Sequence, residues 1–300
     1  MSDPAVSPLR SRLRQSAQRL GAAVAALYAV GCSGLYFGQD RILFPGHDTQ
    51  GTADADAWPN NGTQRVDLTA ADGTKVVARY RPATGTKPGA PTVLFFYGNA
   101  MCAAWCDGII EMLNDLGCNV LVPDYIGYGQ SDGKPSEANC YATADAAWQY
   151  LRQRPDIAAD RIVVMGWSLG AGVGIDLAAR EPAAGLITLS AFTRVSDVAR
   201  QHYPFVPVRL FVRSKFDNLT KATRINCPTL IVHGRRDTLI DPDMGQRLHD
   251  AIAGSEIVWL ASADHNTMFD AEPRTLVTAI RRLLERRVPA TRPATQPFRG

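Results

Sequence analysis

From Thr92 onward the chain contains short runs of uninterrupted apolar residues, separated by longer segments in which apolar and polar positions mix. Runs without alternation are typical of parallel strands that are covered on both faces, whereas two earlier segments alternate as antiparallel edge strands do. The pattern predicts eight strands, at Gln64–Thr69, Lys75–Arg81, Thr92–Phe96, Asn119–Pro123, Arg161–Gly166, Gly185–Leu189, Thr229–His233 and Glu256–Leu260.

Helical segments are expected between these strands, at Ala103–Leu116, Ser136–Arg152, Ser168–Ala179, Asp243–Ala253 and Pro273–Arg287. Alternation of strand and helix implies right-handed crossovers and an α/β fold with a doubly wound, mostly parallel eight-stranded sheet. We assign residues 64–287 to this domain. The stretch 191–226 is too short for a full lid, so we expect either a minimal cap over the sheet or a surface connector.

The N-terminal region has a different pattern. Four arginines precede an uncharged run of 18 residues, Leu20–Phe37, which as a helix would measure about 27 Å. We therefore interpret residues 1–38 as a membrane anchor, a signal sequence or, at Ala29–Ser33 with Cys32, a lipoprotein processing site. All three options place the arginines inside and the catalytic domain on the extracytoplasmic side, and the anchor and the lipoprotein also attach the protein to the membrane. The alternative is a buried N-terminal helix of the domain, which the four preceding arginines make a poorer fit than a targeting segment. Residues 39–63 are expected to be a connector.

The net charge of +3 is unevenly distributed. The first 19 residues carry four Arg and one Asp, and the last 20 carry six Arg and one Glu, so the ends sum to +8 and the middle to −5. A mildly acidic body argues against nucleic-acid binding. The tail 288–300, rich in Pro, Arg and Thr, is expected to be disordered.

The segment Gly166–Gly170 reads Gly-Trp-Ser-Leu-Gly and lies between a predicted strand and a predicted helix. In that context G-x-S-x-G forms a tight turn that exposes the serine hydroxyl, here that of Ser168. The turn also directs the backbone N–H of the next residue, Leu169, at the reacting oxygen, where it contributes to an oxyanion hole.

An acid and a histidine follow in the order Ser, Asp, His. Asp237 comes just after the strand at 229–233, and His265 follows the strand at 256–260. Carboxyl ends of parallel strands share one edge of the sheet, so we predict that both meet Ser168 there. Asp241 is an alternative acid that fits a helix N-cap better, and Asp264 and His233 are expected to be structural.

Together these segments resemble the α/β-hydrolase superfamily, and more narrowly its small, often membrane-anchored serine hydrolases. The likeness covers residues 64–287 and rests on five pieces in the right order, Phe95–Ala100, Pro123–Ser131, Gly166–Gly170, His233–Asp237 and Asp264–Asn266. It implies the α/β-hydrolase fold and a Ser168–His265–Asp237 triad.

The second oxyanion donor should come from the loop after the strand at 92–96. Related sequences have His-Gly-Asn there, and this chain has Tyr97-Gly98-Asn99, which makes the N–H of Asn99 the expected donor. The change to tyrosine leaves open how that loop is supported. For the substrate pocket we name Tyr97, Trp167, Phe192 and Phe205.

These features predict a serine hydrolase that cleaves carboxylic esters or thioesters through an acyl-enzyme, with lipid or acylated molecules as substrates. Two alternatives remain, a serine peptidase of the aminopeptidase type and a catalytically idle, membrane-tethered binding or scaffold module. We expect no cofactor and no metal, because no cluster has ligand spacing. The disulfide state of the five cysteines after Cys32 and the oligomeric state are left open.

Overall fold

The computed structural model describes residues 8–85 and 89–286. Its center is one eight-stranded sheet with the order β1-β2-β4-β3-β5-β6-β7-β8. β1 pairs antiparallel with β2 and β2 with β4, while the other neighbours are parallel. The strands are β1 (Gln64–Thr69), β2 (Lys75–Arg81), β3 (Thr92–Phe96), β4 (Asn119–Pro123), β5 (Ile162–Trp167), β6 (Gly185–Leu189), β7 (Thr229–Gly234) and β8 (Glu256–Leu260).

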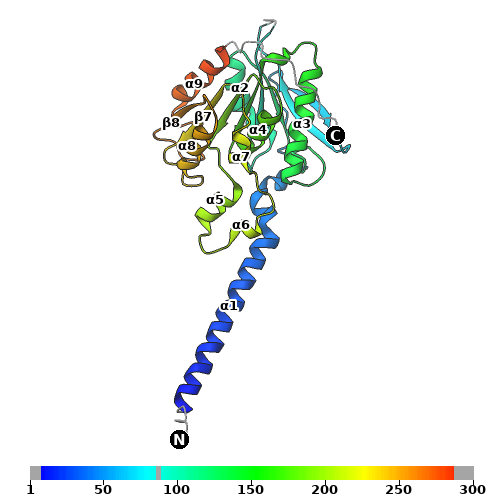
Figure 1. The fold of residues 1–300 in the computed structure, drawn as a ribbon. Coiled ribbons are helices and arrows are strands. Elements are labelled where there is room, and N and C mark those ends of the chain that lie inside the picture. Colours follow the sequence, from blue (N-terminus) through cyan, green and yellow to red (C-terminus); the bar gives the residue numbers. More distant parts are fainter. Residues whose placement is uncertain (1–7, 86–88, 287–300) are drawn as a thin grey trace, which may run out of the picture.

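Helices cover both faces of the sheet (Figure 1). α2 (Asp107–Asp115) and α9 (Pro273–Glu285) pack on one face. The other face carries α3 (Glu137–Gln153), α4 (Leu169–Arg180), α7 (Asn218–Ala222) and α8 (Pro242–Ala251). The predicted fold class, a mostly parallel doubly wound sheet, is therefore confirmed.

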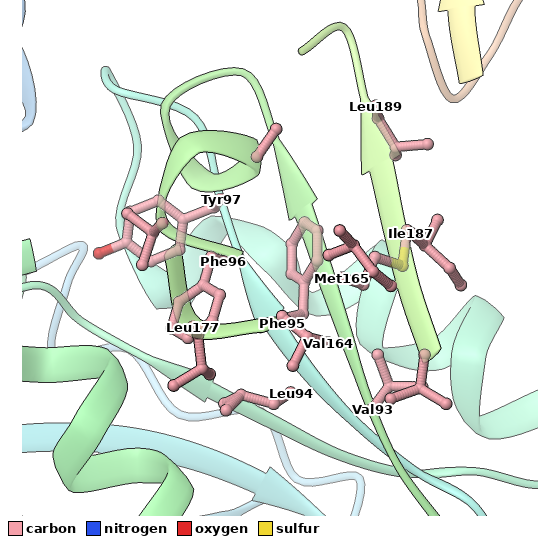
Figure 2. Close-up of a cluster of buried hydrophobic side chains, with 14 of the residues drawn as sticks. Val93, Leu94, Phe95, Phe96, Tyr97, Val164, Met165, Leu177, Ile187 and Leu189 are labelled. Carbon is pink, nitrogen blue, oxygen red and sulfur yellow. The ribbon is translucent and has the colours of Figure 1, made fainter. Parts of the chain in front are cut away.

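The central strands are buried over their whole length, which explains their unbroken apolar sequences. β3, β4 and β6 are buried at all five positions. Figure 2 shows the side chains of β3, β5 and β6 packed together, with Phe95, Met165 and Ile187 among them. This core supports the strand ends at which the predicted site residues lie.

Two helix predictions needed correction. The helix expected at Ala103–Leu116 is a 3₁₀ turn, η2 (Ala103–Cys106), followed by α2. At the N-terminus α1 spans Pro8–Leu43 and passes the boundary that we placed at residue 38. Asp40 and Arg41 follow the apolar run and continue the helix. It ends at Leu43, because Pro45 disfavours helical conformation in the residue before it, Phe44.

The rest of the connector packs on the domain. A short 3₁₀ helix, η1 (Pro45–Thr49), follows α1, and Phe44 is fully buried in the core. Between β6 and α7 the chain forms α5 (Val195–His202) and α6 (Val208–Phe211), which lie beside the C-terminal part of α1 (Figure 1). A third 3₁₀ turn, η3 (Ala159–Arg161), precedes β5. The predicted tail 288–300 lies outside the described residues.

All six cysteines are free thiols. Cys102, Cys106, Cys118 and Cys140 are buried, and burial raises the pKa of Cys118 to about 12. These side chains pack as small apolar groups.

Candidate active site

Ser168 lies at the sharp turn between β5 and α4. Its backbone has φ 55° and ψ −117°, a strained left-handed conformation for a residue with a side chain. A Cβ atom on Gly166 would lie 2.1 Å from the carbonyl oxygen of Gly170, and one on Gly170 would lie 2.0 Å from that of Phe96. Only glycine fits at either position, so the two glycines permit the close approach that this turn requires.

The structure brings the three predicted triad residues into one hydrogen-bonded chain. His265 Nε2 lies 2.9 Å from Ser168 Oγ, and His265 Nδ1 lies 2.8 Å from Asp237 Oδ2. Both distances are within reach for proton transfer from the hydroxyl to an imidazole that the carboxylate orients. All three side chains are buried, which strengthens these interactions relative to water.

Asp237 is held in its ionised form by its neighbours. Burial alone would raise the pKa of Asp237, but hydrogen bonds from His233 and His265 and from the backbone N–H of Ile240 hold it well below its usual range. The N–H of Leu239 also donates to Oδ1, at 3.0 Å. Asp237 therefore stays a carboxylate and can stabilise a positively charged His265.

The alternative candidates have structural roles. Asp241 caps α8 by accepting from the N–H of Asp243, and Asp264 accepts from the N–H groups of Asn266 and Thr267. His233 is buried beside Asp237, with Nε2 3.1 Å from the carbonyl of Ile240. Neither Asp241 nor Asp264 makes the contact to His265 that Asp237 makes.

The loop after β3 is held against the site by tyrosines. The hydroxyl of Tyr97 donates to Asp124 Oδ1 at 2.9 Å, and that carboxylate also accepts from the N–H groups of Ala103 and Gln130. Tyr128 donates to the carbonyl of Asn99 at 2.9 Å. The sequence had left open how this loop is supported when tyrosine stands in place of the histidine of related sequences. The hydrogen bond from Tyr97 to Asp124 is part of that support.

The same carbonyl of Asn99 accepts from the N–H of Gly46 at 2.9 Å, and the side-chain amide of Asn99 donates to the carbonyl of Leu43 at 3.4 Å. The end of α1 and the start of η1 therefore brace the loop that carries Asn99. Leu169 is the first residue of α4, where the positive end of the helix dipole favours a developing negative charge.

A cavity of about 500 Å³ opens beside Ser168. Asn99 and Leu169, the two expected oxyanion donors, line it together with Ser168, and helices α1, α5 and α6 supply most of the remaining wall. Its lining residues are Cys32, Leu35, Tyr36, Gln39, Ile42, Leu43, Asn99, Ser168, Leu169, Phe192, Val195, Val198, Ala199, His202, Tyr203, Val206, Val208, Phe211, Val212, Leu239 and Ile240.

This lining corrects the predicted pocket. Phe192 lines the cavity. Tyr97 does not, because it is fully buried against the rings of Tyr125 and Tyr128. Trp167 packs against the rings of His265 and Phe269 instead. Phe205 is 87% exposed on the cap and does not belong to the cavity lining. Aromatic character alone does not show which side of a loop a residue faces.

We did not predict from the sequence that α1 contributes to the cavity. Its apolar run predicts a membrane segment, and the sequence of such a run does not distinguish residues that face lipid from residues that face a cavity.

In residues 8–85 and 89–286, no group of three or more His, Cys, Asp or Glu side chains is placed to hold a metal ion.

The sheet topology, the strained serine turn and the buried Ser–His–Asp chain define a protein of the α/β-hydrolase class. A family model described as the alpha/beta hydrolase fold matches residues 91–213. An uncharacterized protein of Mycobacterium tuberculosis is 31% identical over 265 residues, which cover 87% of this chain and 93% of that relative. The chain belongs to the α/β-hydrolase superfamily and is a hydrolase.

Alpha/beta hydrolase domain-containing protein 17B of Xenopus laevis is 37% identical over 177 residues, which span 58% of this chain and 60% of that relative. Among solved structures, the esterase Pf2001 of Pyrococcus furiosus superimposes with a TM-score of 0.64 at 21% identity, over 76% of this chain and 95% of the esterase. At that identity the esterase likeness concerns the fold alone.

Proposed function

We propose that the protein is a serine hydrolase that cleaves carboxylic ester or thioester bonds through an acyl-enzyme intermediate. The observation that carries this proposal is the buried chain from Ser168 through His265 to Asp237, with contacts of 2.9 and 2.8 Å. A serine hydroxyl is a weak nucleophile at neutral pH, and a base at this distance with an oriented tautomer is what activates it.

In the proposed reaction Ser168 Oγ attacks the substrate carbonyl carbon while His265 Nε2 accepts the hydroxyl proton. The N–H groups of Leu169 and Asn99 stabilise the negatively charged oxygen of the tetrahedral intermediate. His265 then donates the proton to the leaving alkoxide or thiolate. Water attacks the resulting acyl-enzyme with His265 as the base again, which releases the acid and restores Ser168.

The cavity supports an apolar acyl group as the substrate part that is held there. Its described lining is dominated by Leu, Ile, Val and aromatic side chains, and it contains no Asp or Glu. An aminopeptidase needs a carboxylate to hold the substrate ammonium, so this lining favours esters or thioesters of fatty acids over peptides. An idle scaffold would have no need for the buried triad geometry.

We further propose that the protein is attached to a membrane by α1. Within the described residues α1 is the one helix that is long and apolar enough to cross a bilayer, and the part of its apolar run from residue 20 to residue 31 is exposed. The arginines that precede the run favour an orientation with the N-terminus inside and the domain on the extracytoplasmic side.

The test is a substrate panel with the purified full chain in detergent and the Ser168→Ala variant as control. The panel contains p-nitrophenyl esters from acetyl to palmitoyl, an acyl thioester, and amino-acid p-nitroanilides. We expect ester or thioester hydrolysis that Ser168→Ala abolishes. Hydrolysis of the anilides alone would favour the peptidase, and hydrolysis of nothing in the panel would contradict the proposal.

A further inference from the structure

One face of α1 forms a wall of the cavity beside Ser168. The lining residues that α1 contributes recur with the spacing of one helix face, and they are Cys32, Leu35, Tyr36, Gln39, Ile42 and Leu43. The opposite wall comes from the cap, where Val198 and Val208 belong to α5 and α6. The segment that resembles a membrane anchor is therefore also part of the binding site.

Polar contacts fix α1 to the cap. Arg213 Nη2 pairs with Asp40 Oδ2 at 2.7 Å, and the backbone N–H of Arg213 donates to Gln39 Oε1 at 2.8 Å. The rings of Tyr36 and Phe211 meet edge to face, with centroids 6.1 Å apart. Farther along the helix, the hydroxyl of Tyr28 donates to the carbonyl of Phe205 at 2.7 Å. These contacts hold the α1 wall at a set distance from α5 and α6.

The wall leads away from the reacting atoms. Its near end is Leu43, whose carbonyl accepts from the side chain of Asn99 on the loop after β3, which we call the oxyanion loop (Tyr97–Asn99). Its far end is Cys32, eleven residues back along the helix, or about 16 Å at 1.5 Å per residue. An extended chain advances about 1.2 Å per bond, so this wall can flank an acyl chain of about 13 bonds.

We propose that α1 is a specificity-determining element of the active site, and that Leu35 on α1 sets which acyl chains the cavity accepts. The inference rests on the proposed ester or thioester hydrolysis for its substrate class. Leu35 lies eight residues from Leu43, about three-quarters of the way along the wall, where only a long chain reaches it. The helix must then stay attached to the mature protein, because its removal would open the cavity along its whole length.

The test compares Leu35→Trp, which fills the far part of the cavity, with Leu27→Trp as a matched control. Leu27 lies on the same helix and is 76% exposed, outside the cavity lining. We measure the ratio of kcat/KM for the p-nitrophenyl palmitate and butyrate esters with the full chain in detergent. Leu35→Trp is expected to lower this ratio about tenfold or more, because the larger side chain fills the volume that the distal part of a long acyl chain would occupy. Leu35→Ala is expected to raise it.

A second readout does not need turnover. In the Ser168→Ala background, Leu35→Trp should weaken binding of the fluorescent fatty acid cis-parinaric acid several-fold relative to Leu27→Trp. If wild-type protein hydrolyses no ester but this difference in affinity is found, the proposed function fails, while the inference that α1 determines which acyl chains bind is supported. If folded Leu35→Trp and Leu35→Ala match Leu27→Trp in both the ratio and the affinity, the inference is overturned.

Discussion

Asp237 and His265 are joined by a 2.8 Å contact between Oδ2 and Nδ1, with the carboxylate side chain fully buried and the imidazole 7% exposed. Oδ1 of the same carboxylate accepts from the N–H groups of Leu239 and Ile240. The carboxylate is thereby fixed in place, and its Oδ2 faces Nδ1 of His265, with Nε2 of His233 3.4 Å away. This arrangement leaves Nε2 of His265 as the acceptor that faces Ser168.

Replacement of Asp237 by asparagine should remove the charge and favour the wrong imidazole tautomer. We expect kcat on an active ester to fall by about 10⁴, with a much smaller change in KM, because only the reacting state needs the ion pair. Asp241→Asn is the matched control, since Asp241 only caps α8, and its kcat should stay close to that of the wild type. An Asp241→Asn loss equal to that of Asp237→Asn would reassign the acid.

The lowered pKa of Asp237 also predicts a pH dependence of stability. A carboxyl whose pKa is lower in the folded state than in the unfolded state stabilises the fold above its unfolded pKa of about 3.9. That contribution is lost as the pH falls from about 4 toward the folded value. The difference in Tm between wild type and Asp237→Asn should therefore be largest near pH 7 and shrink below pH 4. A difference that grows on acidification would contradict the assignment.

Tyr97→Phe tests the support of the oxyanion loop. It removes the hydroxyl that donates to Asp124. Burial raises the pKa of Asp124, and its hydrogen bonds, including the one from Tyr97, oppose that rise. Loss of a hydrogen bond to a buried charged group should lower the free energy of unfolding by about 2 kcal/mol. Because the loop carries Asn99, we also expect kcat to fall more than KM changes.

The control for that variant is Tyr150→Phe, which removes a tyrosine hydroxyl that accepts from Arg154 on the part-exposed surface of α3. Its kcat should match that of the wild type, and denaturant unfolding should show a smaller loss of stability. If Tyr97→Phe changes stability but leaves kcat intact, Tyr97 supports the fold without positioning the oxyanion loop.

Much of the fold was predictable because burial on both faces leaves a direct trace in the sequence. The predicted strand at 161–166 is β5 at Ile162–Trp167, displaced by a single residue. The turn at Ser168 was predictable from glycines that steric contact requires. Strand order along the chain then placed Asp237 and His265 at the same sheet edge as Ser168.

The cavity was not predictable in the same way. Its walls come from α1, α5 and α6, and their relative placement depends on tertiary contacts such as Arg213–Asp40, which have no local sequence signal. Phe205 shows the opposite error, since an aromatic residue on a short excursion lies outside the cavity and is exposed. Tyr97 was recognised as an unusual residue, but its partner Asp124 became evident only in three dimensions.

Attachment by α1 predicts hydrophobic rather than electrostatic association with membranes. Protein reconstituted in phosphatidylcholine vesicles should float with them in 1 M salt, where charge attraction is screened. Leu27→Arg places a charge inside the exposed apolar run and should oppose insertion by about 3 kcal/mol. Leu13→Arg, beside the basic residues Arg12 and Arg14, is the matched control and should float like the wild type. Release of the wild type by salt would contradict the prediction.

The most direct test of the account is covalent labelling of the purified full chain with a fluorophosphonate probe, followed by mass spectrometry of the labelled peptide. We expect stoichiometric labelling on Ser168 that is lost in Ser168→Ala and strongly slowed in Asp237→Asn. Folded wild-type protein that remains unlabelled, or a label on another residue, would contradict the claim that the buried Ser168–His265–Asp237 chain activates a nucleophile.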